Sequence, residues 1–342
     1  MIRRNNLTNF SNIINKNKPK VGQTPKTAIW RKNKATVWFY PAREQKYQTP
    51  LFLIYSLVSK SYILDLSPET SMIQAFTTHG YNVYLLDFGV PGYEDKDLTL
   101  DDYVTKYIEK GVECSLAHSN TKDLTIIGYC LGGTLATMYA AITSQRIKNL
   151  ILLVAPIDFS HIPLPVNWKQ MLKNERPAIE NLIDQYGIIP PNVIDKGIKV
   201  ITSPISITPY LALSDKRGDS HSVEKWQAFN HWARDHIPFV GGTIKQLIFD
   251  IALDNKLAKN RLILNGKRVN LRNIKSNLLV VSANNDDLVP EKSTSPIIRL
   301  VSSKDKTYKS INGGHASLAV KGYLPDFLKK WLAEHSHSIN TE

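Results

Sequence analysis

Short apolar runs recur along the chain, and stretches with apolar residues at helical spacing separate them. Uninterrupted runs of this length are typical of strands buried on both faces of a parallel sheet. We interpret as strands LFLIYSLV (51–58), NVYLLDF (82–88), LTIIGYC (124–130), NLILLVAP (149–156) and NLLVVSA (277–283), with a strand or hairpin at 27–40 and a weaker strand at 307–311. Helices are predicted at 71–78, 101–117, 134–142 and 323–335. This alternation predicts an α/β fold with a mostly parallel sheet, right-handed crossovers and flanking helices.

Two segments depart from the alternation. Residues 1–26 are polar and rich in Asn and Lys, which predicts a flexible basic arm. Residues 158–272 are rich in proline and include the aromatic stretch KWQAFNHWARDHIPF, and we interpret them as an inserted, mainly helical cap. The predicted organisation is therefore the arm, a first part of the core (27–157), the cap, and a second part of the core (273–342).

The composition is that of a globular enzyme, with 42% hydrophobic and 21% charged residues. No apolar run approaches the roughly 18 residues of a membrane-spanning helix, and the N-terminus lacks the apolar core of a secretory signal. The two cysteines, Cys114 and Cys130, do not make a disulfide framework. We therefore expect a cytoplasmic protein that does not span a membrane.

The formal net charge of +13 raises the question of a nucleic-acid partner. The basic residues are scattered along the chain, however, and no helix-turn-helix, zinc-ligand set or aromatic RNA-binding pattern accompanies them. We expect no nucleic acid. The charge instead suits an anionic partner such as a phosphate-bearing substrate.

The strongest chemical signal is Gly128-Tyr129-Cys130-Leu131-Gly132-Gly133, which stands where a predicted strand ends and a helix begins. This is the context of the nucleophile elbow G-x-S-x-G of the α/β-hydrolase fold, with Cys130 in the position of the serine. The glycines permit the tight turn, and the helix N-terminus favours a thiolate. The backbone N–H of Leu131 would then point at the oxyanion site. A buried structural cysteine beside a glycine turn is the alternative, and the strand–turn–helix context disfavours it.

In this fold the nucleophile is followed along the chain by the acid and then by the histidine. His315 follows the last predicted strand in a glycine loop, and none of the other eight histidines does. Two adjacent carboxylates, Asp286 and Asp287, follow strand 277–283, at the sheet edge where active sites lie. We choose Asp286 as the acid because it precedes Pro290 by four residues, as in the loop pattern D-x-x-V-P, and Asp287 remains the alternative.

Longer stretches resemble the polyhydroxyalkanoate synthases. The resemblance rests on YSLVSKSYILDLSPETSMIQAF, GYNVYLLDFGVPGYEDKDLTLDDYVTKYI and the elbow with the following NLILLVAPIDF. The lead-in VGQTPKTAIWRKNKATVW is similar to that of the short, two-component synthases, the class III and class IV catalytic subunits. The resemblance runs from about Val21 to the last helix.

The resemblance implies an acyltransferase that polymerises (R)-3-hydroxyacyl-CoA into polyhydroxyalkanoate and releases CoA. It places the nucleophile on Cys130, the acid on Asp286 and the histidine on His315. Many members carry a histidine where this chain has Asp287 and an asparagine near Ser59. These departures concern the tuning of the acid and the second oxyanion donor, which we place at the backbone N–H of Val58.

The resemblance also implies no resident cofactor, since the coenzyme A thioester is the substrate, and no metal. The implied partners are the growing polyester chain, the granule surface in the cytoplasm, and a second synthase subunit and/or a second copy of the chain. Either His315 or Asp286 would activate the incoming hydroxyl. The alternatives are a thiol-dependent hydrolase (an esterase, thioesterase or depolymerase) of the same fold and a non-catalytic granule protein.

Overall fold

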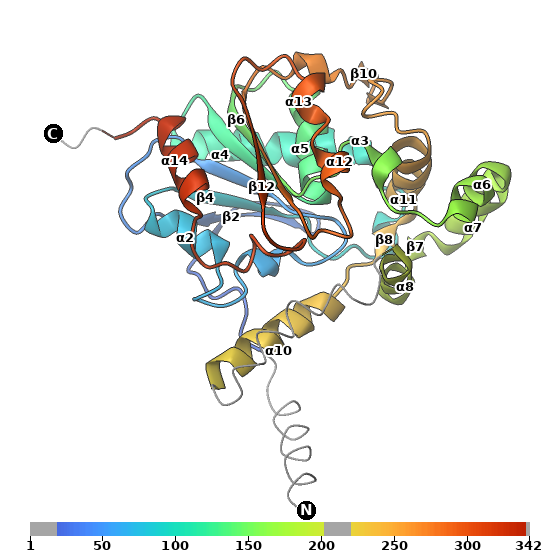
Figure 1. Ribbon diagram of the computed structural model, residues 1–342, viewed down its shortest axis with the longest axis horizontal. Helices are drawn as coiled ribbons and strands as arrows, with labels where there is room; N and C mark the ends of the chain where they lie inside the picture. Colours follow the sequence, from blue (N-terminus) through green and yellow to red (C-terminus); the bar gives the residue numbers. More distant parts are fainter. Residues whose placement is uncertain (1–18, 202–219, 340–342) are drawn as a thin grey trace, which may run out of the picture.

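The structure is a computed structural model that describes residues 19–201 and 220–339. Most of the predicted arm (1–18) and part of the predicted cap (202–219) therefore lie outside the described residues. Figure 1 shows a central sheet with helices packed against it and further helices, α6, α7, α8 and α10, beside and below it.

The sheet has eight strands in the order β1-β2-β4-β3-β5-β6-β11-β12. The pairs β1–β2 and β2–β4 are antiparallel, and all other pairs are parallel. The strands are β1 (Thr27–Lys32), β2 (Ala35–Tyr40), β3 (Leu51–Ile54), β4 (Val83–Asp87), β5 (Leu124–Tyr129), β6 (Ile147–Leu153), β11 (Asn277–Ala283) and β12 (Lys306–Ile311). The predicted α/β fold with a mostly parallel sheet is confirmed.

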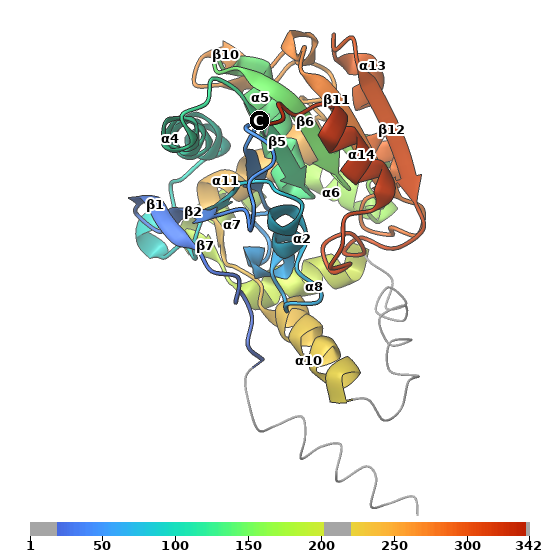
Figure 2. The ribbon, with the colours of Figure 1, turned by 90° about the vertical axis from the view of Figure 1, so that its left-hand side faces the viewer.

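Both faces of the central strands are buried, as the apolar runs predict. In β4, Tyr84 and Leu86 pack into one hydrophobic cluster, whereas Val83 and Leu85 pack into the cluster on the opposite face. The first cluster includes side chains from π-helical η3 (Tyr103–Ile108), α4 (Glu109–Ser119) and α5 (Leu131–Ile142), and the second includes side chains from α2 (Met72–Thr78) and α14 (Asp326–Glu334). The sheet therefore lies between two helical layers, which are seen edge-on in Figure 2.

Several element bounds differ from the predictions for physical reasons. Helix α14 begins at Asp326 because Pro325 occupies the N-cap position. Helix α5 begins at Leu131, directly after the elbow, so that two glycines lie in its first turn. Strand β3 ends at Ile54, and the chain from Tyr55 to Val58 leaves the sheet instead of continuing the strand. The short helices α12 (Glu291–Thr294) and α13 (Ile297–Leu300) were not predicted, because four residues show no periodicity.

The segment predicted as a cap (158–272) lies between β6 and β11 and is mostly helical in its described part. Its helices are α6 (Val166–Asn174), α7 (Arg176–Tyr186), α8 (Pro191–Ile201), α10 (Ser220–Arg234), α11 (Gly241–Lys245) and π-helical η7 (Gln246–Leu253). Two small antiparallel pairs lie in the same segment: β7–β8 (Ile188–Ile189 with Phe239–Val240), and, after η7, β9–β10 (Ile263–Leu264 with Lys267–Arg268).

The end of the predicted arm is bound to the core. The buried carboxylate of Asp65 accepts hydrogen bonds from the Thr24 backbone N–H (3.0 Å), the Thr24 hydroxyl (2.6 Å) and the Ser71 hydroxyl (2.6 Å). The Gly22 N–H donates to the Asp65 carbonyl oxygen at 2.8 Å. Burial of the carboxylate requires these donors. The predicted flexible arm therefore does not extend to residue 26, because residues 22–24 are held by Asp65.

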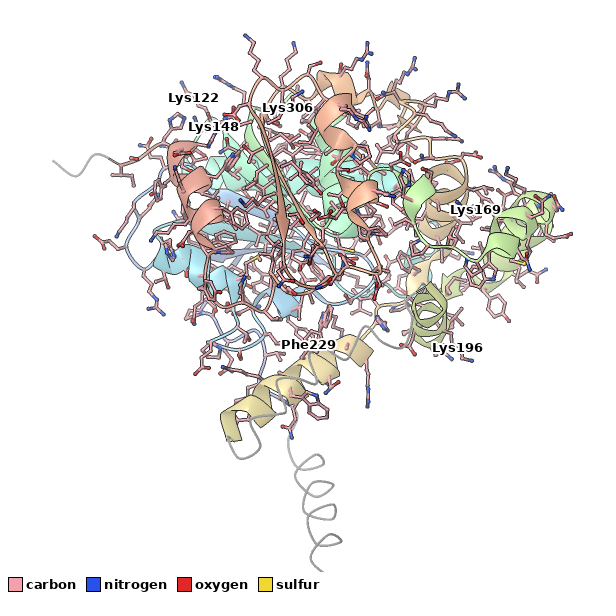
Figure 3. The ribbon with its side chains drawn as sticks, viewed as in Figure 1. Lys122, Lys148, Lys169, Lys196, Phe229 and Lys306 are labelled. Atoms are coloured by element: carbon pink, nitrogen blue, oxygen red, sulfur yellow. The ribbon has the colours of Figure 1, made fainter. Side chains whose placement is uncertain are left out.

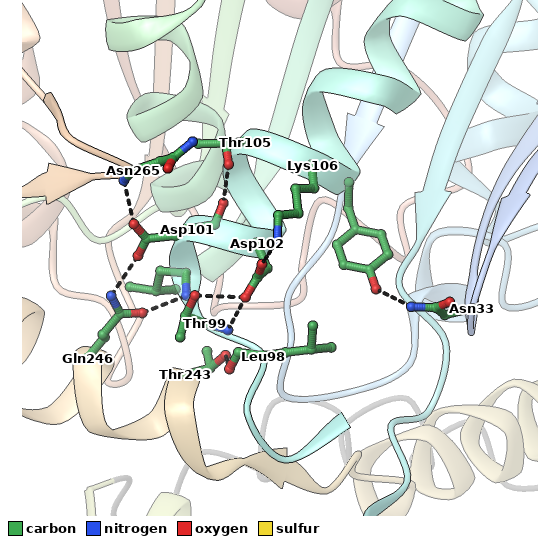
Figure 4. Close-up of polar contacts among 12 residues, drawn as sticks. Asn33, Leu98, Thr99, Asp101, Asp102, Thr105, Lys106, Thr243, Gln246 and Asn265 are labelled. Atoms are coloured by element: carbon green, nitrogen blue, oxygen red, sulfur yellow. Dashed lines mark hydrogen bonds and ion pairs between the residues drawn. The ribbon is translucent and has the colours of Figure 1, made fainter. Parts of the chain in front are cut away.

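A second polar cluster joins the last part of the cap to the core (Figure 4). Asp101 accepts hydrogen bonds from the Gln246 side chain (2.8 Å) and from the Asn265 backbone N–H, both in the cap. Its neighbour Asp102 accepts from the Thr99 N–H (2.9 Å) and from Lys106 (2.5 Å) within its own helix. The two adjacent carboxylates thus have separate roles: Asp101 binds the cap, and Asp102 binds groups at the start of its own helix.

The basic groups are spread over the molecule. Figure 3 places Lys122, Lys148 and Lys306 toward one end and Lys169 and Lys196 on the projecting helices at the other. These labelled lysines are thus scattered in space, as the basic residues are along the sequence. No helix within the two described ranges is long and apolar enough to cross a membrane.

The glycines of the first α5 turn allow a test of the fold. A Cβ at Gly132 would lie 2.2 Å from the Ile54 carbonyl oxygen, whereas a Cβ at Gly197 in α8 would meet nothing within 4 Å. We expect Gly132→Ala to lower the free energy of unfolding by about 3 kcal/mol or more. Gly197→Ala should instead raise it by about 0.5–1 kcal/mol. Urea unfolding of both variants measures this, and equal stability would contradict the packing of α5 on β3.

Candidate active site

The turn from β5 into α5 places Cys130 in a strained conformation. Its φ of 53° and ψ of −130° lie where side chains other than glycine are rare. The Cys130 N–H donates to the Leu153 carbonyl oxygen of β6 (2.9 Å), and the Cys130 carbonyl oxygen accepts from the Gly133 N–H (2.9 Å). Hydrogen bonds to the adjacent strand and the helix therefore maintain the strain, which raises the thiol above the carboxyl end of the sheet.

The glycines around Cys130 are required by close backbone contacts. A Cβ on Gly128 would lie 2.4 Å from the Gly133 Cα, and one on Gly133 would lie 2.3 Å from the Ala155 Cβ. Neither distance is possible between real atoms. The motif thus has the structural context that its sequence predicts: the glycines allow the strand and the helix to approach, and the cysteine occupies the turn.

The histidine and the acid come from neighbouring strand ends. Because β11 and β12 are parallel neighbours, their following loops meet, and the Asn285 N–H donates to the Gly313 carbonyl oxygen at 3.0 Å. The Asp286 Oδ2 lies 2.7 Å from the His315 Nδ1. The other oxygen of Asp286 accepts hydrogen bonds from the N–H groups of Leu288 (3.0 Å) and Val289 (2.8 Å). Asp287 is exposed, so the structure places Asp286 of the two carboxylates against the histidine.

His315 contacts Cys130 as well as Asp286. Burial disfavours the charged imidazole, but the charges of Asp286 and Cys130 and hydrogen bonds to both outweigh it, so that the pKa of His315 is raised well above its ordinary value. Since its Nδ1 faces Asp286, its Nε2 is left for the thiol. The structure therefore brings Cys130, His315 and Asp286 together in a chain of hydrogen bonds, the arrangement that activates a nucleophile.

The two predicted oxyanion donors are placed differently. Leu131 is the first residue of α5, so its N–H is among those that no carbonyl within the helix accepts. The N–H of Val58 donates to the Ser56 hydroxyl at 3.2 Å, within the loop that follows β3. An oxyanion bound by the Val58 N–H would have to displace the Ser56 hydroxyl. Binding by the Leu131 N–H would break no hydrogen bond within the helix.

The cap packs onto the same loop. The Ile237 N–H donates to the Val58 carbonyl oxygen (3.0 Å), and the Trp232 indole N–H donates to the Lys60 carbonyl oxygen (3.0 Å). The Asp235 carboxylate accepts from the Lys60 ammonium (2.9 Å) and the Tyr62 hydroxyl (3.0 Å). The end of α10 and the residues after it therefore fix the loop that holds Val58.

Three aromatic residues of this stretch pack against the core. Phe229, labelled in Figure 3, and Trp232 of α10 pack against the hydrophobic cluster on one sheet face, with their ring centroids 5.5 Å apart. Phe239 is buried in the cluster on the other face. These side chains thus attach the cap to the core.

Two tyrosines beside the nucleophile were not identified from the sequence. The Tyr129 hydroxyl donates to the His315 backbone carbonyl oxygen at 2.7 Å. Tyr55 is buried beside Cys130, and burial raises the pKa of its phenol despite a hydrogen bond with the Ser59 side chain. A tyrosine within an apolar run is indistinguishable from a packing residue in the sequence, so only the contact with the histidine loop reveals Tyr129.

Comparison with known proteins shows that the chain has the alpha/beta hydrolase fold. The chain matches a model of the alpha/beta hydrolase fold over residues 49–186. A monoglyceride lipase from Saccharomyces cerevisiae aligns with 94% of this chain and 97% of its own, at a TM-score of 0.56 and 18% identity. A monoacylglycerol lipase from Paleococcus ferrophilus aligns with 85% and 98%, at a TM-score of 0.54 and 15% identity. At such identities the likeness shows the fold alone, and it confirms the predicted α/β-hydrolase fold.

The sequence comparisons are more specific. A model of the poly-beta-hydroxybutyrate polymerase (PhaC) N-terminus matches residues 5–76. The poly(3-hydroxyalkanoate) polymerase subunit PhaC of Haloferax mediterranei is 32% identical over 94% of this chain, which spans 66% of that protein's length. The subunits of Synechocystis sp. and Allochromatium vinosum are 30% and 29% identical, and this chain spans 90% and 93% of their lengths. The chain therefore belongs to the poly(3-hydroxyalkanoate) polymerase (PhaC) family and is an acyltransferase, as the sequence motifs predicted.

Proposed function

We propose that this chain polymerises (R)-3-hydroxyacyl-CoA into polyhydroxyalkanoate and releases CoA, with the growing chain held as a thioester on Cys130. The observation that carries the proposal is the hydrogen-bonded sequence from Cys130 through His315 to Asp286 at a nucleophile elbow, in a chain of the PhaC family.

The first half of the cycle is an exchange of thioesters. His315 takes the proton of Cys130, and the thiolate attacks the acyl carbonyl of the substrate. The N–H of Leu131 stabilises the resulting oxyanion, with the N–H of Val58 as second donor if Ser56 gives way. The C–S bond to CoA then breaks, and His315 returns the proton to the leaving thiolate. Because attacking and leaving groups are both thiolates, the exchange is close to energetic balance.

The second half joins the acyl group to the 3-hydroxyl of the next monomer. The hydrogen bonds of Asp286 and His315 favour His315 as the base for this step. Both oxygens of Asp286 already accept hydrogen bonds from His315, Leu288 and Val289, and its side chain is fully buried. With Nδ1 of His315 bound to Asp286, its Nε2 is the nitrogen available to the thiol, where the acyl group would be attached. Asp286 therefore keeps the imidazole oriented and stabilises its charge, while His315 moves the proton.

Elongation requires that water be kept from the acyl-enzyme, and the cap supports this. The segment from Trp232 to Ile237 crosses the loop of Val58 through four hydrogen bonds and ion pairs. Exclusion of water also strengthens the charge interactions within the site. A thiol-dependent hydrolase of the same fold would instead have to admit water, and it would release free acid. The remaining partners in the proposal are a second synthase subunit and the granule surface.

The first prediction concerns the nucleophile. We expect Cys130→Ala to abolish both polymer formation and the mass increase of the protein on exposure to a 3-hydroxyacyl-CoA. Cys114→Ala should retain both, because Cys114 lies in α4 and burial raises the pKa of its thiol. Turbidity from polymer and intact-protein mass spectrometry are the two readouts. An inactive Cys114→Ala beside an active Cys130→Ala would refute the assignment.

The second prediction concerns the acid. Asp286 raises the pKa of His315, so Asp286→Asn should lower that pKa and decrease turnover by about 10³–10⁴-fold, because the imidazole loses its orienting partner. The raised pKa stabilises the wild-type fold below the unfolded pKa, and this contribution disappears as pH rises through the folded pKa. Asp286→Asn should therefore lose stability mainly at acidic pH.

Asp287→Asn is the matched control, since Asp287 is exposed. It should change neither turnover nor the pH dependence of stability, measured by urea unfolding between pH 5 and 9. The opposite ranking of the two variants would transfer the role of the acid to Asp287.

The third prediction concerns the cap and the second subunit. We expect the isolated chain to rest largely closed and the partner to shift it toward an open, competent state. Hydrogen exchange across 160–270 should therefore become faster when the partner is added. Asp235→Asn, which weakens the contacts to Lys60 and Tyr62, should speed exchange near 225–240 without the partner.

Asp184→Asn provides the control within the cap, because Asp184 forms an ion pair with Lys245 away from this contact. Exchange near 225–240 should be unchanged in this variant. Unchanged protection across 160–270 with the partner present, together with full specific activity of the chain alone, would exclude the closed-state hypothesis.

A further inference from the structure

The residue before the nucleophile contacts the histidine at atoms that the acid does not bind. Tyr129 is the last residue of β5 and only 3% exposed. Its hydroxyl donates to the backbone carbonyl oxygen of His315 at 2.7 Å, joining residues 186 positions apart in the chain. A buried phenol that loses its acceptor pays a desolvation cost, so this bond is maintained in the folded state.

The ring of Tyr129 also contacts the imidazole. The two rings meet edge to face, with centroids 6.2 Å apart and an interplanar angle of 86°. Tyr129 also packs against Tyr55, at a centroid distance of 5.8 Å. One side chain therefore touches both the backbone and the ring of His315, while its own backbone is continuous with Cys130.

The loop of His315 needs such a contact. Gly313 has a φ of 150°, and the loop is held before the histidine by the Asn285–Gly313 hydrogen bond and by the Gly314 N–H, which donates to the Ser317 hydroxyl at 2.8 Å. Asp286 fixes the rotation of the imidazole. None of these contacts joins the loop to β5, the strand that leads to the nucleophile. The hydrogen bond from Tyr129 does so.

We propose that Tyr129 is a positioning residue, which sets the separation of His315 from Cys130 by holding the histidine backbone to the end of β5. The proposal rests on the proposed function, in which His315 takes the proton of Cys130. Loss of the hydroxyl alone would leave the acid–histidine pair intact and would move that pair relative to the thiol. A small displacement suffices, because proton transfer depends steeply on distance.

Tyr129→Phe tests the proposal, with Tyr84→Phe as the matched control. Tyr84 is a fully buried tyrosine on β4 whose hydroxyl is hydrogen-bonded to the His118 Nδ1 (2.9 Å), outside the site. Each variant therefore keeps its ring and loses one partly buried hydrogen bond to a histidine residue. The rate at which iodoacetamide alkylates Cys130 is measured from pH 5 to 10 without substrate, and labelling of Cys114 in the same sample monitors the fold.

We expect Tyr129→Phe to slow alkylation of Cys130 at pH 7 by about tenfold and to shift its pH profile upward. The turnover number should fall by a similar factor while KM stays unchanged. Tyr84→Phe should match the wild type in both measurements. An unaltered pH profile in Tyr129→Phe would overturn the proposal. So would faster labelling of Cys114 in that variant, since the effect would then be a general loss of structure.

His315→Ala separates failure of this proposal from failure of the proposed function. If His315→Ala is alkylated as fast as the wild type at pH 7, the histidine does not activate the thiol, and both proposals fail. If alkylation is slow in His315→Ala and normal in Tyr129→Phe, the histidine acts as proposed and Tyr129 has no part in positioning it.

Discussion

The contact between the first turn of α5 and the carboxyl ends of β3, β5 and β6 determines the rest of the site. At Gly132 the backbone is so close to the Ile54 carbonyl oxygen that no side chain fits, and at Gly133 the helix approaches Ala155 equally closely. Because the helix cannot move away, the residue between β5 and α5 must take a positive φ. The strained thiol, the position of Leu131 at the start of the helix and the direction of the helix dipole follow from this one contact.

The elbow and the central strands were predictable from the sequence, because each of them requires particular residue types at particular positions. The elbow requires glycines at fixed spacing, and strands buried on both faces require uninterrupted apolar runs. The choice of Asp286 over Asp287 rested on its distance from Pro290, and in the structure Asp286 is the one that contacts His315. The loop returns the backbone N–H groups of Leu288 and Val289 to the carboxylate, and this turn ends just before the proline.

Other features of the structure require no particular local pattern of residues, so the sequence did not predict them. The early end of β3 and the packing of the cap on Val58 depend on contacts between distant segments, and neither changes the local pattern of residues. The anchoring of Thr24 by Asp65 is similar, since a polar lead-in has the same composition whether or not a buried carboxylate binds it. Tyr129 is the clearest case: within LTIIGYC it is one more apolar residue, and its partner lies in a loop far along the chain.

The hydrogen bond from Ile237 to the Val58 carbonyl oxygen has a kinetic consequence. The segment from Trp232 to Ile237 is bonded to the loop after β3, in which the proposed function uses the Val58 N–H as second oxyanion donor. Displacing the segment to admit a bulky thioester therefore also releases that loop. Under the proposed function, admission of a new monomer and the orientation of the Val58 N–H are therefore coupled through this contact. Such a coupling would add a conformational step to each round of elongation, beside the chemistry on the thiol.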